Sequence, residues 1–102
     1  MATKLKSNQK QIREDVIFNA YLTLNNEHDF YKKVYGEIKK NGNKIITLAK
    51  FDSLVKQGFN QYVKHYSRTE QSLFDNKAIR IVSKQLRDGF KEEIEFAKKY
   101  KH

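Results

Sequence analysis

The chain of 102 residues is long enough for one domain, and it carries 21 lysine and arginine residues against 12 acidic residues, which gives a net charge of +9. Without cysteine it cannot form disulfides, thiol nucleophiles or cysteine-ligated zinc sites, and it has no apolar run near the ~20 residues that span a bilayer. Because 13% of the residues are aromatic and residues 1–11 hold no apolar leader segment, we expect a folded, soluble, cytoplasmic domain without a membrane partner.

The first predicted element is a basic N-terminal arm over residues 1–11, which we expect to be flexible or disordered. It contains Lys4, Lys6 and Lys10 and no acidic residue. Basic arms of this kind follow phosphates or enter grooves in several DNA-binding families. The alternative is an ordinary frayed terminus. Residues 12–102 then form a single helical domain.

The next two segments have the apolar spacing of helices. From Ile12 to Leu24 an apolar residue recurs at every fourth position, which predicts one helical stripe that ends near Asn25. A second helix should begin after an N-cap at Asp29. It should end at Gly42, where a left-handed C-cap residue belongs.

Two further helices complete the chain. Thr47 is the predicted N-cap of the third helix, whose apolar arc of roughly 120° includes Phe59 and leaves Leu54 outside. A fourth helix should start between residues 72 and 75 and run to about residue 100, either unbroken or as two helices joined near Gly89.

The scarcity of turn residues decides the fold class. Proline is absent and glycine occurs four times, so a turn-rich β-sandwich or barrel is excluded, and residues 67–69 are the expected loop before the last helix. The chain is therefore predicted to be all-α, a single-domain bundle of about four helices behind the basic arm.

The last two helices each present a cationic face. On the third helix, Lys50, Gln57 and Lys64 follow one another at i, i+7 and i+14, so cations are available for phosphates and an amide for a base edge. The fourth helix has a cationic stripe of five residues: Lys77, Arg80, Lys84, Arg87 and Lys91. The alternative is a solvated surface, partly neutralised by ion pairs from Lys84 to Asp88 and from Lys91 to Glu95.

Tyr31 is a second kind of candidate contact. It precedes Lys32 and Lys33, so an exposed ring there would be able to stack on an unpaired base. Packing against the core is the alternative, and it is the commoner role of such rings.

No motif in the chain indicates catalysis. The histidines, His28, His65 and His102, are scattered, and neither a phosphate-binding glycine loop nor a nucleophile elbow occurs. We therefore expect no enzymatic activity, no catalytic residue, no cofactor and no metal.

Two hypotheses of function follow. The first is a small basic helical protein that binds nucleic acid, DNA rather than RNA; its Lys/Asn-rich composition suits a regulatory protein or one from a mobile element or virus, acting inside the cell or in the host cytoplasm. The alternative is a protein–protein interaction module, such as an adaptor, an inhibitor or a homodimeric structural protein, with no nucleic-acid role.

Overall fold

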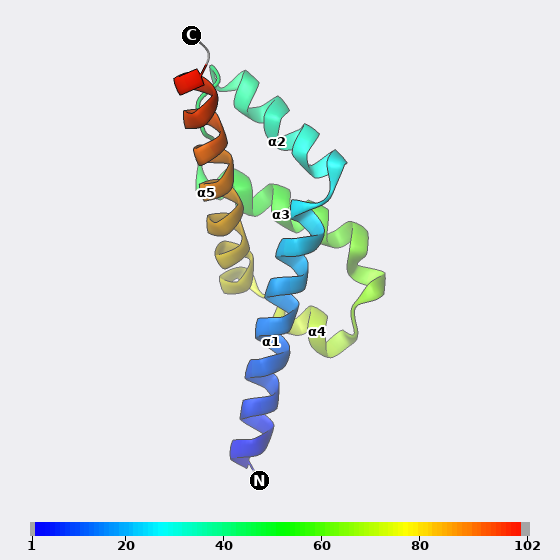
Figure 1. Cartoon of the computed structure of the whole chain (residues 1–102). Coiled ribbons are helices and arrows are strands. Elements are labelled where there is room, and N and C mark those ends of the chain that lie inside the picture. The colour runs from blue at the N-terminus through cyan, green and yellow to red at the C-terminus, as the bar shows by residue number, and fades with distance from the viewer. Residues whose placement is uncertain (1, 101–102) are drawn as a thin grey trace.

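The computed structural model describes the backbone of residues 2–100 and the side chains of residues 9–99, and all regular structure in that part of the chain is helical. The elements are α1 (Ala2–Asn25), α2 (His28–Lys40), α3 (Leu48–Tyr62), the 3-10 helix η1 (Val63–His65), α4 (Arg68–Leu73) and α5 (Asn76–Tyr100). In Figure 1, α1 and α5 lie side by side and α3 crosses behind them. The all-α prediction is confirmed.

Local signals set the ends of α2 and α3. The Thr47 hydroxyl accepts a hydrogen bond from the backbone N–H of Lys50 at 3.2 Å, so this residue is the N-cap of α3 as predicted. Gly42 has a left-handed backbone with φ of 71°, which confirms the predicted end of α2. The N-cap of α2 is Glu27 rather than Asp29, and its carboxylate accepts from the Asp29 N–H.

The segment before α5 contains a short helix that the sequence does not predict. Ser67 caps α4 by accepting from the Glu70 N–H at 3.1 Å, and the Glu70 carboxylate accepts from the Ser67 N–H at 2.8 Å. This reciprocal capping box converts most of the expected loop at residues 67–69 into helix. After it, α5 is one continuous helix through Gly89.

The basic N-terminal segment also differs from expectation. The backbone of residues 2–11 forms the first turns of α1, and in Figure 1 these turns extend beyond the other helices. Lys10 is exposed, whereas the side chains of Lys4 and Lys6 lie outside the described residues.

One hydrophobic core joins α1, α2, α3 and α5. Phe59 and Phe90 are buried in it, as their central positions in the two apolar stripes predict. The Phe90 ring lies 4.8 Å from Tyr31 and 5.9 Å from Phe51, measured between ring centroids. Leu54 is also buried, with 7% of its surface exposed, so its predicted position outside the core is wrong. The reason is that α2 and α5 pack on two sides of α3, which widens its buried arc.

A glycine permits the close approach of α1 to α3. A Cβ atom at position 58 would lie 2.5 Å from Cδ2 of Leu24, which is itself buried in the core. Gly89 is also helical, but a Cβ atom there would meet nothing within 4 Å. The two glycines therefore form a matched pair for a stability measurement.

Gly58→Ala should destabilise the protein by about 1 kcal/mol or more, since overpacking a core costs roughly 1–3 kcal/mol and offsets the helical preference of alanine. Gly89→Ala should stabilise it by about 0.5–1 kcal/mol, because only the helical preference applies. Urea denaturation followed by circular dichroism gives both values. Equal stability of the two variants would contradict the contact of Gly58 with Leu24.

Candidate nucleic-acid interface

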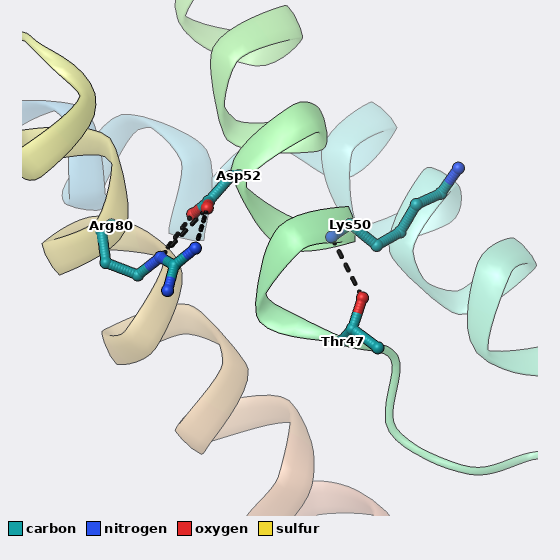
Figure 2. A network of polar contacts seen from close by, with 4 residues as sticks. All are labelled: Thr47, Lys50, Asp52 and Arg80. Carbon is teal, nitrogen blue, oxygen red and sulfur yellow. Dashed lines mark hydrogen bonds and ion pairs between the residues drawn. The ribbon is translucent and has the colours of Figure 1, made fainter.

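The outer side of α3 forms a polar face between two flanking helices. Its exposed residues are Ala49, Lys50, Ser53, Lys56, Gln57, Asn60 and Gln61, which we call the α3 face. Figure 2 shows Lys50 on one side of α3 and Arg80, bound to Asp52, on the other. The α3 face is therefore bordered by α2 on the Lys50 side and by α5 on the Arg80 side.

An open groove between α2 and α3 contains three lysines and one acid. Its lining comprises Lys33, Gly36, Glu37, Lys40, Lys50, Leu54 and Gln57. The Glu37 carboxylate lies 3.5 Å from Nζ of Lys50 and 3.8 Å from Nζ of Lys40, so one negative charge is shared by two ammonium groups. The groove keeps a net positive charge.

On the α5 side, the structure divides the predicted cationic stripe into two groups. Nη2 of Arg80 lies 2.6 Å from Oδ2 of Asp52, and Nε of Arg87 donates to the carbonyl of Ile46 at 2.9 Å. These two arginines hold α5 against α3 and the loop before it. The remaining members are exposed lysines: Lys77, Lys84 and Lys91.

These three lysines form no ion pair with any residue that the structure describes. The pairs that would neutralise the stripe, Lys84 with Asp88 and Lys91 with Glu95, are not formed within residues 9–99. Their positive charge therefore remains available to a ligand.

The Arg80–Asp52 ion pair makes the free energy of unfolding depend on pH. Burial raises the pKa of Asp52, but the hydrogen bonds and the charge of Arg80 lower it, and the pKa lies below its ordinary value. A carboxyl group whose pKa is depressed by folding stabilises the folded state above its unfolded pKa of about 4. That contribution is lost as the pH falls through the folded pKa.

Asp52→Asn should therefore flatten the fall in the free energy of unfolding between about pH 5 and pH 2. Asp88→Asn is the matched control, because Asp88 is exposed and its carboxylate has no ion pair in the described part of the chain. Thermal unfolding of both variants across this pH range makes the comparison. If Asp52→Asn kept the acid dependence of the original protein, the ion pair would not contribute to it.

Two predicted contacts lie elsewhere. Lys64 is exposed but belongs to η1, because α3 ends at Tyr62 and the helical spacing that groups Lys64 with Gln57 stops there. Tyr31 is packed: its ring contacts Phe90, and its hydroxyl donates to Oδ1 of Asn25 at 2.8 Å. The packing interpretation of Tyr31 is confirmed.

Helix α2 contributes cations to this site that the patterns on the last two helices do not predict. Lys33 and Lys40 are seven residues apart and so share one side of a helix, which is a signal present in the sequence. Their position beside α3 becomes clear only when the two helices are packed together.

Other kinds of site are not found in the described residues. No three histidine, aspartate or glutamate side chains among them lie close enough to hold a metal ion. None of the helices described is both long and apolar enough to cross a membrane. In comparisons with known proteins, the chain matches no family model, no curated protein and no solved structure.

Proposed function

We propose that this protein binds double-stranded DNA through the α3 face and the lysines that border it. One observation carries the proposal: cations lie on the α2 side and on the α5 side of α3, while Glu37 of α2 and Asp52 of α3 are each in an ion pair. A surface of this kind releases counterions from DNA phosphates when it binds. A basic face of limited extent is the electrostatic feature expected of such proteins.

The arrangement suggests a division of roles. The major groove of DNA is about 12 Å wide and admits one helix, and α3 has small or polar residues on its exposed side. Gln57 and Asn60 present amides that are able to pair with base edges. We assign phosphate contacts to Lys33, which lines the groove beside α3, and to the exposed Lys84 of α5. Such contacts would fix the protein on DNA without reading its sequence.

The test is the salt dependence of DNA affinity in the double variant Lys77→Ala/Lys84→Ala. If both lysines contact phosphates, the slope of log affinity against log salt concentration should fall by about 0.9 for each contact, or about 1.8 in total. The loss should be similar for all DNA sequences, since phosphate contacts are independent of sequence. Fluorescence anisotropy with a labelled duplex measures it.

The matched control is Lys32→Ala/Lys39→Ala, which removes the same charge from exposed positions of α2 that do not line the groove. The control variant should keep the slope of the original protein. A slope that is reduced equally in both double variants would show that net charge alone drives binding, and would remove the assignment to the α3 face. An unchanged slope in Lys77→Ala/Lys84→Ala would exclude these two lysines as phosphate contacts.

A protein–protein interaction module is the second candidate function, and the exposed apolar side chains of Phe18, Leu22 and Ile81 favour it. Chromatography at low and high salt separates the two candidates. Nucleic acid that copurifies and is released by salt supports the first, whereas a dimer that is insensitive to salt and free of nucleic acid supports the second. From the composition of the chain we also propose a regulatory role in a mobile element or virus, and action in the cytoplasm.

A further inference from the structure

The middle of the α3 face differs in chemistry from its two edges. At about 100° per residue, four of its residues fall within about 80° of the helix circumference. They carry a methyl group, a hydroxyl group and two amides, and all four are exposed: Ala49, Ser53, Gln57 and Asn60. We call these four residues the centre of the α3 face. Lys50 and Lys56 lie about 20° beyond the centre, on opposite sides of it.

The two edge lysines lie beside different flanking helices. Lys50 lines the groove beside α2, and its Nζ lies 3.5 Å from the Glu37 carboxylate. Lys56 lies near Asn76 on the side of α5. Asp52, the one acidic residue of α3, is bound by an arginine of α5. The centre of the α3 face therefore contains neither a cation nor an acid.

The two amides at the centre are not used by the fold. Elsewhere in the chain, an amide has a structural role: Gln71 donates to the carbonyls of Val63 and Tyr66 at 3.1 and 2.9 Å. The side chains of Gln57 and Asn60 form no hydrogen bond with any residue that the structure describes. The carbonyl oxygen and the NH2 group of each amide are thus available to a ligand.

These side chains match one kind of base pair better than the other. In the major groove, arginine and lysine pair with guanine, and aspartate and glutamate pair with cytosine. Asparagine and glutamine instead form two hydrogen bonds with N6 and N7 of adenine, and the methyl group of alanine packs on the methyl group of thymine. The centre of the α3 face has two amides, a methyl group and a hydroxyl group that suits either pair, but no group that selects guanine or cytosine.

The spacing of the two amides suits neighbouring base pairs. Gln57 and Asn60 are three residues apart, which is about 4.5 Å along the helix axis, and base pairs are stacked about 3.4 Å apart. We propose that α3 selects A·T-rich DNA, and that Gln57 and Asn60 each bind one adenine through its N6 and N7 atoms. This assignment rests on the proposed binding of DNA by the α3 face. The edge lysines contact phosphates and add no preference for a base pair.

Two labelled duplexes of about 20 base pairs, or two helical turns, provide the probe. Their flanks are identical, and the central block consists of A·T pairs in one and of G·C pairs in the other, with purines on both strands. We expect the A·T duplex to bind at least about tenfold more tightly, since each bidentate contact discriminates by about fivefold or more. Fluorescence anisotropy at one fixed salt concentration measures both affinities.

Gln57→Ala/Asn60→Ala tests the assignment to these two residues. This variant should bind the A·T duplex as weakly as the G·C duplex, with an unchanged salt dependence because no charge is removed. Both side chains are exposed, so thermal unfolding should be unchanged. The matched control is Asn19→Ala/Gln85→Ala, which removes the same two amides from exposed positions of α1 and α5 outside the α3 face and should keep the preference.

A modified base separates contacts in the major groove from an effect of DNA shape. A·T-rich DNA also has a narrow minor groove, which attracts cations. The base 7-deazaadenine still pairs with thymine but lacks the N7 acceptor in the major groove. Replacing adenine by it should weaken binding of the original protein by at least about fivefold, and should leave the affinity of Gln57→Ala/Asn60→Ala unchanged.

The outcomes distinguish this inference from the proposed function. Failure to bind either duplex would overturn DNA binding itself, and the choice of base pair with it. Equal affinity for the two duplexes would leave DNA binding standing and would overturn the choice of A·T pairs. A preference for A·T pairs that persists in Gln57→Ala/Asn60→Ala, or with 7-deazaadenine, would also overturn the inference, because the two amides would not be its source.

Discussion

Phe59→Ala should lower the free energy of unfolding by about 3–5 kcal/mol. The Phe59 ring is 7% exposed and stacks on Phe74 with 4.2 Å between ring centroids, and its centroid lies 4.8 Å from that of Tyr66. Truncation would leave a cavity that these two neighbouring rings close only in part. Because Phe74 and Tyr66 flank α4, the variant should also loosen this short helix. A loss of this size is a large share of the roughly 5–15 kcal/mol that stabilises a domain.

Urea denaturation measures the effect, with Phe96→Ala as the control. Phe96 is 63% exposed, so the same substitution there should cost less than about 1 kcal/mol. If Phe59→Ala unfolded at the urea concentration of the original protein, α3 would be rotated relative to the structure. The exposed positions of Lys50 and Gln57 would then be wrong as well.

Leu54→Ala should cost about 2–5 kcal/mol, the usual range for a buried leucine. The helical arc predicted from sequence leaves Leu54 outside the core and so predicts a small effect. The structure instead places it in the hydrophobic cluster, with 7% of its surface exposed. The helical arc and the structure thus predict effects of Leu54→Ala on the free energy of unfolding that differ by several kcal/mol.

Ser53→Ala is the control for Leu54, because Ser53 is the adjacent residue of α3 and is exposed. It should change the free energy of unfolding by less than about 0.5 kcal/mol. A Leu54→Ala protein as stable as the Ser53→Ala protein would mean that α2 does not cover this side of α3.

The sequence predicts correctly those features of the fold that are determined by residues close together in the chain. Apolar spacing shows the phase of α3 and α5, and single residues mark helix ends, such as Thr47 before α3 and Gly42 after α2. Helical spacing leaves Leu54 outside the core because its burial depends on α2, which packs against α3 through tertiary contacts. The helical backbone of the first turns of α1 is not predicted for a different reason: these residues have no apolar stripe that would indicate a helix.

The candidate interface was predictable to a similar extent. Helical spacing predicts exposed positions for Lys50, Gln57 and Lys84, and all three are exposed. The sequence does not show which of the cations form ion pairs or hydrogen bonds within the fold. Arg80 bonds to Asp52 across 28 positions of sequence, and Arg87 bonds to Ile46 across 41. Such pairs depend on how α5 packs against α3, and no local pattern encodes them.

The most direct test of the proposed interface is a titration of the isotope-labelled protein with a short DNA duplex, followed in amide nitrogen–proton spectra at low salt. Binding through the α3 face predicts chemical-shift changes concentrated at Lys33 on α2, at Ser53, Gln57 and Asn60 on α3, and at Lys84 on α5. Amides of Glu14 and Phe18 on α1 should move little, because these residues do not belong to the α3 face. Shift changes centred on α1, or no change in the α3 face at DNA concentrations that saturate binding, would contradict the proposal.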